Sequence, residues 1–369
     1  MFSEYFADLT DSRQAGKVKH NFLEIVVMTI CAVIAGCEAW EDIGDYIRVK
    51  QDWFRERLHM KLENGVPSHD TIQRIWGMIE PEEFEKCFRS WVSSVCGSTE
   101  GEIISIDGKT LRGSGDHEKN PLHMVSAWAN ENQLVLGQVY TDEKSNEITA
   151  VPQLLDALDV EGCIITADAM SCQKVITAKI TEKRADYVLG LKDNQPNLKR
   201  DVEEFFEDVL NDPKESSGIQ HVHTVDKGHG RMETRDYYFT TDLDWMLYKD
   251  GWTALNSVGT VVSTVVCGKN RTKECRYFIS SLTDGKLFAK AVRSHWGVEN
   301  SLHWCLDMTF HEDYCRMRKD HTAENMAVVR HIALDALKLH PAKMSLARKK
   351  RHCSYDDEFL AQVLDLIHA

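Results

Sequence analysis

The stretch Ile103–Gly113 constrains this chain more than any other, and it reads I-I-S-I-D-G-K-T-L-R-G. Its first four residues, three isoleucines and one serine, are typical of a buried strand in a mixed sheet. The strand then delivers a carboxylate, Asp107. Such a group is expensive to desolvate unless a cation or hydrogen-bond donors meet it. Asp107 is therefore either the first metal-binding acid of a catalytic site or a cap on the turn after the strand.

A second acid, Asp168, lies in the same context. It follows the short apolar run Ile164–Thr166 and precedes a small residue and a polar turn, as Asp107 does. Two strands of one sheet can place such acids side by side, where they repel each other unless divalent cations lie between them. Mg²⁺ accepts a few carboxylates and keeps open positions for water and phosphate oxygens. The pair therefore predicts a magnesium site.

We expect the third acid, Glu299, to come from a helix that covers this edge of the sheet. Charged, polar and aromatic side chains crowd the stretch 293–304, and several of them share one helical face. Three carboxylates around two metal ions would form a phosphoryl-transfer site. The alternatives are an ordinary amphipathic helix with Glu299 in water, or one of three rival acids nearby. The rivals are Asp307, Glu312 and Asp313.

Composition limits the compartment and the partners. Eleven cysteines without regular pairing, and no signal peptide, indicate a reducing cytoplasm. The most apolar run, Ile25–Ala35, is too short to cross a bilayer, so it predicts a buried helix and no membrane association. The net charge of −14 argues against wholesale non-specific nucleic-acid binding. Any DNA contact must come from local basic patches.

The order of predicted elements divides the chain into three parts. Residues 1–97 form a helical domain, which either binds DNA or only packs, and Gly65-Val66-Pro67 before a short helix weakly resembles a helix-turn-helix. Residues 98–340 form an α/β catalytic domain, a mixed sheet flanked by helices, with a β-rich insertion at about 212–282. Residues 341–369 form a basic C-terminal tail or helix.

Several polar and basic side chains are candidates for DNA contact. Ten Lys or Arg stand against four Asp or Glu in residues 313–352, and phosphate contacts require charge and not sequence. Trp296 is a candidate for stacking on an unpaired base or for the core. For the other groups the alternatives are turn chemistry and solvated loops. The candidates are Lys109, Arg112, Lys192, Asn194, Gln195, His229, Arg231, His295, Trp296, Arg316, Arg318 and Lys319.

Three other kinds of site fail on spacing. Gly108-Lys109-Thr110 resembles the end of a P-loop, but Ile103 stands where the first glycine is needed. Arg112-Gly-Ser-Gly lacks the glycine that a nucleophile elbow requires two residues before the serine. A zinc site at 305–321 would lack a Cys-x-x-Cys anchor.

The chain resembles the H-repeat-associated transposases, bacterial insertion-sequence enzymes of the DDE superfamily, over nearly its whole length. The matching stretches are I-D-G-K-T-L-R at 106–112, T-D-E-K-S-N-E-I-T-A at 141–150, D-A-M-S-C-Q-K at 168–174, L-K-D-N-Q at 191–195, H-G-R-M-E-T-R at 229–235 and H-W-G-V-E-N-S-L-H-W-C-L-D at 295–307. The resemblance implies a ribonuclease-H-like core in which Asp107, Asp168 and Glu299 are the D, D and E.

The resemblance also implies a function. It predicts cleavage at the ends of the element and strand transfer into target DNA, with two Mg²⁺ ions for which Mn²⁺ substitutes. The expected partners are double-stranded DNA, as terminal inverted repeats and as target, and a second copy of the chain in a dimeric synaptic complex. The expected location is the cytoplasm, at the nucleoid.

The chain departs from related enzymes around the glutamate. His295 stands where an arginine is expected, four residues before Glu299, and Leu306 stands where a lysine is expected, seven residues after it. Two alternatives therefore stay open: a catalytically inactive DNA-binding relic, and a ribonuclease-H-like nuclease without strand transfer.

Overall fold

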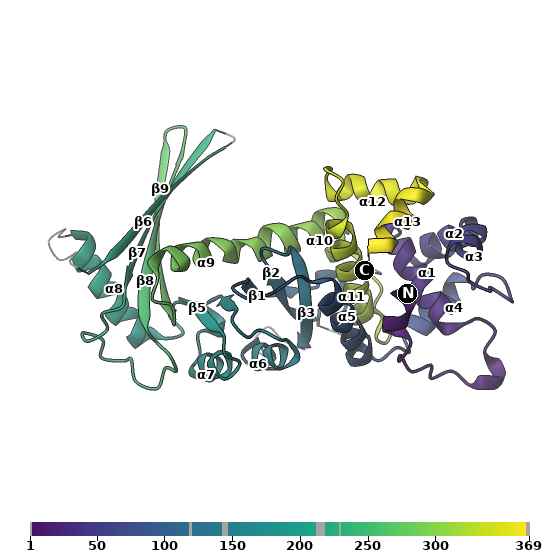
Figure 1. Cartoon of the computed structure of the whole chain (residues 1–369), viewed down its shortest axis with the longest axis horizontal. Helices are drawn as coiled ribbons and strands as arrows, with labels where there is room; N and C mark the ends of the chain where they lie inside the picture. The colour runs from purple at the N-terminus through teal and green to yellow at the C-terminus, as the bar shows by residue number, and fades with distance from the viewer. Residues whose placement is uncertain (1, 118–119, 142–146, 212–217, 229, 367–369) are drawn as a thin grey trace.

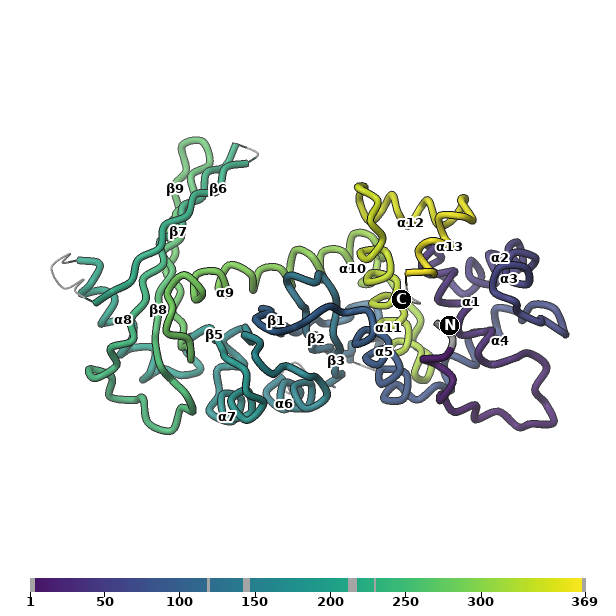
Figure 2. Tube along the Cα trace, in the orientation of Figure 1, coloured from purple at the N-terminus to yellow at the C-terminus, as the bar shows by residue number. Residues whose placement is uncertain are grey.

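The structure is a computed structural model that describes residues 2–117, 120–141, 147–211, 218–228 and 230–366. The molecule is elongated, with a cluster of helices at one end, a sheet with flanking helices in the middle and a projecting β-arm at the other end (Figure 1). The tube in Figure 2 shows that both described termini lie within the helical cluster.

The described residues form one sheet of nine strands in the order β3-β2-β1-β4-β5-β9-β8-β7-β6. Its first half pairs β1 antiparallel to β2 and parallel to β4, which in turn is parallel to β5. This mixed arrangement confirms the predicted ribonuclease-H-like fold class. The five strands of this half are β1 (Ile103–Thr110), β2 (His123–Ala129), β3 (Leu134–Thr141), β4 (Ile164–Ala167) and β5 (Asp186–Leu191).

The predicted β-rich insertion forms the second half of the sheet. Its strands are all antiparallel, and β9 joins β5 through pairs such as Leu191 with Tyr277. The bases of β7, β8 and β9 are buried and their distal ends are exposed, because the flanking helices do not reach that far, whereas β6 is largely exposed along its length (Figure 1). The strands are β6 (Gln220–Gly228), β7 (Arg231–Thr240), β8 (Ser257–Cys267) and β9 (Asn270–Ser280).

Helices cover both faces of the sheet. The helices α6 (Glu147–Ala157) and α7 (Lys174–Glu182) lie on one face, and α9 (Gly285–Gly297) crosses the other (Figure 1). The helix α9 contacts β1, β4 and β7, so it joins the two halves of the sheet. It begins at Asp284, whose side chain accepts from the N–H groups of Lys286 and Leu287. The acidic helix α8 (Pro196–Asn211) contacts β8 and β9.

The helical cluster combines both ends of the chain. The helix α11 (Thr322–Leu339) packs against α1 and α5, and both α11 and α5 contact β3, so these two helices link the cluster to the sheet. The run 25–34 of α1 is buried throughout, as its apolar sequence predicts. The remaining helices of the cluster are α1 (Phe22–Ile34), α2 (Trp40–Val49), α3 (Gln51–Arg57), α4 (His69–Trp76), α5 (Pro81–Val95), α12 (Leu346–Tyr355) and α13 (Asp357–Leu366).

The C-terminal segment is packed rather than extended. The helices α12 and α13 contact α11, and α12 also contacts α1, so residues 346–366 lie beside the N-terminal helices. The side chains of Lys349 and Lys350 are buried and donate to backbone carbonyls, including Leu337 O at 2.8 Å and Thr309 O at 2.6 Å. Half of the basic cluster at 348–351 is therefore used within the fold. Within the described ranges, no helix is both long and apolar enough to cross a membrane.

Candidate active site

The three predicted acids come from three neighbouring elements in the middle of the molecule. Asp107 lies within β1, opposite Ser126 of β2, and Asp168 follows directly after β4, which is the parallel neighbour of β1. Glu299 lies on the helical segment that continues from α9. Asp168 and Glu299 line one cleft of about 510 Å³.

The charges of these acids act on one another. Burial raises the pKa of Asp107 to about 7, and the charges of Asp168 and Glu299 contribute to the rise against a hydrogen bond from the Gly108 N–H. Burial and the charge of Glu147 likewise raise the pKa of Asp168, although N–H groups of Met170 and Ser171 stabilise its anion. The fold thus places several partly buried carboxylates within electrostatic range of one another.

The helix that bears Glu299 changes its winding at that residue. The segment η7 (Val298–His303) has π-helical hydrogen bonding between α9 and α10 (Trp304–Thr309), where sequence periodicity predicts one continuous helix. Periodicity does not reveal a π segment because the segment spans only six residues. Such segments are rare and frequent at functional sites, since they redirect a side chain without ending the helix.

Two histidines flank Glu299 on this helix, and the first of them, His295, anchors it to the sheet. One turn earlier, Nδ1 of His295 lies 3.0 Å from Oγ1 of Thr166 on β4. One turn later, Nδ1 of His303 lies 3.6 Å from Oδ2 of Asp107. Burial lowers the pKa of each imidazole to about 4, so both rings are neutral at pH 7. Because the Thr166 hydroxyl donates to Ser105 Oγ, it accepts from the Nδ1–H of His295.

These carboxylates suit a hard divalent cation by their chemistry. Oxygen donors are the ligands that Mg²⁺ prefers, and mutual repulsion of the buried charges is what a cation relieves. In the described part of the chain, however, no three His, Cys, Asp or Glu side chains converge closely enough to hold a metal ion. The three acids therefore lie on neighbouring elements without a closed coordination sphere.

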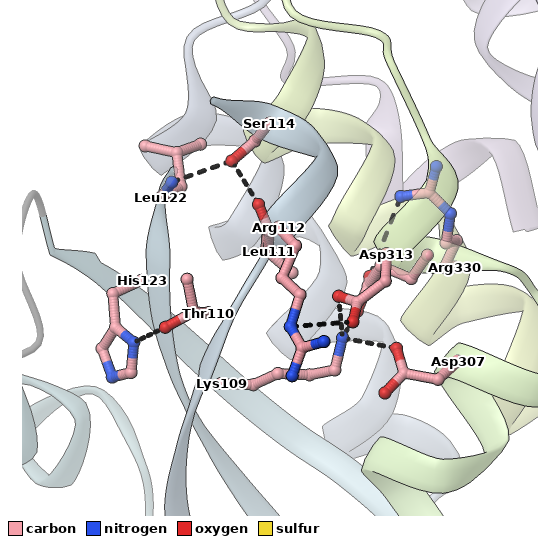
Figure 3. A network of polar contacts seen from close by, with 11 residues as sticks. Lys109, Thr110, Leu111, Arg112, Ser114, Leu122, His123, Asp307, Asp313 and Arg330 are labelled. Carbon is pink, nitrogen blue, oxygen red and sulfur yellow. Dashed lines mark hydrogen bonds and ion pairs between the residues drawn. The ribbon is translucent and has the colours of Figure 1, made fainter. Parts of the chain in front are cut away.

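Lys109 lies two residues after Asp107 on the same face of β1, and its side chain pairs with three carboxylates. Its ammonium group lies 2.7 Å from Oδ1 of Asp307, 3.0 Å from Oε2 of Glu312 and 3.3 Å from Oδ1 of Asp313 (Figure 3). Burial alone would lower the pKa of Lys109, but the neighbouring carboxylates raise it above its usual value. The three rival acids of the sequence are thus the partners of this lysine.

The loop after β1 is fastened to the same segment. Nε of Arg112 lies 3.4 Å from Oδ2 of Asp313, and Nε of Arg318 donates to the carbonyl of Gly113 at 2.6 Å. A Cβ on Gly113 would lie 2.1 Å from the carbonyl oxygen of Cys315, so only glycine fits there. These contacts, together with those of Lys109, fix the strand that carries Asp107 to the segment that follows Glu299 (Figure 3).

Basic side chains line the cleft beside Asp168 and Glu299. Three of the five cations come from the insertion and from α9. Arg235 belongs to the hairpin, with His229 and Arg231, for which the sequence indicates DNA contact, whereas Lys199, Arg276 and Arg293 are not among the predicted contacts. The guanidinium of Arg276 lies 4.8 Å from the ring centre of Trp296, which is 37% exposed. The cations of the cleft are Lys192, Lys199, Arg235, Arg276 and Arg293.

The remaining candidates for DNA contact are either amides bonded within the fold or basic side chains near the surface. Asn194 and Gln195 donate to the carbonyls of Ala169 and Cys172, at 2.6 and 3.0 Å, so their amides fix the loop after Asp168. Arg231 is exposed and pairs with Glu233 at 2.9 Å. Arg316 and Lys319 are exposed beside the partly buried Arg318. His229 lies outside the described residues.

His123 and Glu147 form a buried pair beside the site, and neither residue is among the candidates predicted from the sequence. Nε2 of His123 lies 2.7 Å from Oε1 of Glu147, and both side chains press against Gly108. A Cβ on Gly108 would lie 2.5 Å from each of those two atoms, which explains the glycine after Asp107. The signal in the sequence is the motif at 141–150, which contains Glu147.

Comparison with known families identifies the family of this chain. A family model described as "Transposase DDE domain" matches residues 98–335, and a model of its associated region, "DDE_Tnp_1-associated", matches residues 3–92. The chain belongs to the DDE transposase family. The resemblance seen in the sequence is thereby confirmed.

Two relatives of this transposase match nearly its full length. It is 40% identical to the protein named "H repeat-associated putative transposase YhhI" of Escherichia coli strain K12, over 98% of this chain and 97% of that protein. It is also 40% identical to "Putative transposase YncI" of Escherichia coli O157:H7, over 98% and 93% of the two chains. A solved synaptic complex of piggyBac transposase with hairpin DNA matches 96% of this transposase and 76% of that chain, at 11% identity and a TM-score of 0.45.

Proposed function

We propose that this transposase cuts DNA at the ends of its own mobile element and joins the freed 3′ hydroxyls to target DNA. The observation that supports this most is the electrostatic coupling of Asp107 with Asp168 and Glu299 on three adjacent elements. Paired carboxylates in a cleft with basic walls are what metal-dependent phosphoryl transfer requires.

Asp107, Asp168 and Glu299 would hold two Mg²⁺ ions, with Mn²⁺ as a substitute. When bound, such ions activate the attacking water or hydroxyl and stabilise the leaving oxygen. Asp168 and Glu299 line the cleft, and Asp107, beside the neutral imidazole of His303, would complete the set of ligands. Alignment of the scissile phosphate then provides much of the rate.

We propose that the DNA strand to be cut binds in this cleft. Lys192 presents positive charge beside the acids, and Arg276 and Arg293, which pair with Glu274 and Asp226, would exchange these partners for phosphates, contacts that position DNA without reading its sequence. Trp296, already covered on one face by Arg276, offers an aromatic surface for an unpaired base. Arg112, Arg316 and Lys319 would contact DNA on the other side of the site.

The proposed reaction predicts the oligomeric state of the active complex. Two element ends must be cut and joined together, so we expect a homodimer in a synaptic complex with terminal inverted repeats and target DNA. We expect the protein to act at the nucleoid in the cytoplasm. We propose the domain limits 1–97, 98–340 and 341–369 for this function, with the first part available for end binding.

A DNA-binding relic without catalysis is the second candidate. It is favoured by Leu306, which occupies the position of an expected lysine and is fully buried, and by the neutral His295 at the position of an expected arginine. Against it, Arg276 and Arg293 supply positive charge to the cleft from other positions. A nuclease that cuts without joining strands is a third reading of the same site.

A pair of assays separates these functions. Duplexes that carry the inverted repeats flanking the gene are tested for binding by gel shift and for Mg²⁺-dependent nicking. We expect both activities in the native protein, and Asp168→Asn should abolish nicking while binding persists. Binding without nicking by the native protein would establish the relic. Nicking without joined products from pre-cut ends and plasmid would establish the nuclease.

A further inference from the structure

The distal ends of β6–β9 form an arm that stands clear of the helices (Figures 1 and 2). From Asn270 to Cys275 every residue of β9 is exposed, which corresponds to about 20 Å of strand. The residues 227–228 and 230–231 at one tip and 267–273 at the other include no carboxylate. They carry Lys227, Arg231, Lys269, Arg271 and Lys273.

The register of the arm divides its cations between two faces. Lys227 pairs with Met232, Met232 with Val266, and Val266 with Arg271, so these four side chains form one row across the arm. Lys273 lies two residues from Arg271 on β9 and therefore on the same face. We call this face, with Lys227, Arg271 and Lys273, the outer face.

The opposite face of the arm continues into the active-site cleft. Arg235, Ser263 and Glu274 form one row of that face, and Tyr237, Val261 and Arg276 form the next. All six line the cleft with Asp168 and Glu299, whereas the outer face reaches it only through Cys275 and Tyr277 at the edge of β9.

The two faces differ in how their charges are used. On the cleft face Arg231 pairs with Glu233, Arg235 with Asp226 and Glu233, and Arg276 with Glu274. On the outer face, Lys227, Arg271 and Lys273 form no ion pair with any residue that the structure describes. In a protein of net charge −14, three exposed cations without a carboxylate partner are available for an external anion.

Acids nearer the base of the outer face do not cancel these cations. Asp236 is already bonded to His221 and His223, at 2.9 and 2.8 Å. Glu203 and Glu207 of α8 act on Cys275, two residues closer to the base than Lys273. Positive charge is thus concentrated at the tip, beyond the reach of the flanking helix.

We propose that the outer face of the arm binds the phosphate backbone of target DNA, a duplex distinct from the element end that lies in the cleft of the same chain. This rests on the proposed function. Lys and Arg on a flat ribbon contact phosphates without reading bases, which suits a duplex of arbitrary sequence. The spacing of the row, with Lys227 and Arg271 on the two edge strands of the arm, allows contact with more than one phosphate.

The test removes three charges and measures two activities. The variant Lys227→Gln/Arg271→Gln/Lys273→Gln is compared with Arg184→Gln/Lys286→Gln/Lys290→Gln, which removes the same charge from exposed side chains outside the cleft, the arm and residues 1–97. Binding to a repeat-free duplex is measured by fluorescence anisotropy against salt concentration. Strand transfer of pre-cut ends into plasmid and nicking of intact ends are measured separately.

We expect the arm variant to bind repeat-free duplex roughly tenfold more weakly, with a salt slope lower by about 2.7, at about 0.9 for each phosphate contact. Strand transfer should fall by a similar factor while nicking of ends is unchanged, and the control variant should match the native protein. Equal loss in both variants, unchanged binding and transfer, or parallel loss of nicking would overturn the inference. Absence of nicking in the native protein would instead contradict the proposed function, and the binding measurement would still test the arm.

Discussion

The Nζ atom of Lys109 lies 2.7 Å from the Oδ1 atom of Asp307. Lys109 stands two residues after Asp107 on the strand, and Asp307 stands eight residues after Glu299 on the helix. One helical turn earlier, His303 lies beside Asp107. The strand and the helix therefore approach each other at two successive points. The ion pairs of Lys109, made by side chains outside the proposed metal site, therefore hold the strand that carries Asp107 against the segment that follows Glu299.

Replacing Lys109 by Met should lower the free energy of unfolding by about 3 kcal/mol, because buried carboxylates would lose their cation. The side chain of Glu312, one of its partners, is 1% exposed. Adding Glu312→Gln should recover part of the loss, and urea denaturation measures both variants. Lys179→Met, which breaks only exposed pairs, is the matched control and should have a smaller effect. Equal effects of Lys109→Met and Lys179→Met would contradict the buried network.

Gly113→Ala should disrupt the attachment without changing a charge. The added Cβ would lie 2.1 Å from the carbonyl oxygen of Cys315 and 2.9 Å from that of Asp313, so the segment after Glu299 must move. We expect a lower melting temperature and slower nicking of element ends. Gly16→Ala, where nothing lies within 4 Å of a new Cβ, serves as control and should be neutral. A normal melting temperature for Gly113→Ala would show that this packing is wrong.

Thr166→Val tests the anchor on the other side of Glu299. The hydroxyl accepts from His295 and donates to Ser105, and both bonds are 3.0 Å long. Its loss leaves a buried imidazole N–H unpaired, which should lower the free energy of unfolding by about 2 kcal/mol. Single-turnover nicking should slow while end binding, measured by gel shift, is retained. Unchanged nicking with the expected loss of stability would restrict Thr166 to a structural role.

Glu85 gives a pH dependence of stability. Burial raises its pKa to about 8, against a hydrogen bond from the Gln138 N–H at 2.9 Å and the charge of Arg89. In the unfolded chain the same group titrates near 4.5, its ordinary value. Between these pH values the folded state keeps a proton that the unfolded state has released, so stability falls as pH rises from about 4.5 to about 8.

Glu85→Gln should remove this slope while it keeps the acceptor for Gln138. Relative to the native protein, the variant should gain on the order of 3 kcal/mol of unfolding free energy between pH 5 and pH 8. Urea unfolding at each pH measures the difference. A difference that does not change with pH would show that Glu85 titrates normally in the folded state.

Local composition was sufficient to predict the main elements, although β1 continues through Asp107 to Thr110 where the sequence indicated that the strand ends at Ile106. The isoleucine run before Asp107 forms β1, the apolar run 25–34 forms a buried helix, and the stretch between Asp168 and Glu299 forms a β-rich insertion. Each of these signals is local, since it depends on hydrophobicity over a few residues.

Contacts that depend on the register between distant elements were not predictable in this way. Lys109 follows a predicted catalytic acid and was expected to contact phosphate, but its ammonium group meets carboxylates some two hundred residues away. Arg276 reaches the cleft only because β9 pairs with β5 at Leu191 and Tyr277. The π segment at Glu299 likewise depends on tertiary packing, which hydrophobic periodicity does not encode.

Crystals of the protein with a pre-cut element end, soaked in Mn²⁺, would test the central claim directly through anomalous scattering. We predict manganese peaks in the cleft, within coordination distance of Asp107 and Asp168, with Glu299 completing the ligands. Manganese bound elsewhere, or a Glu299 side chain directed away from the other two acids in the DNA complex, would contradict the assignment.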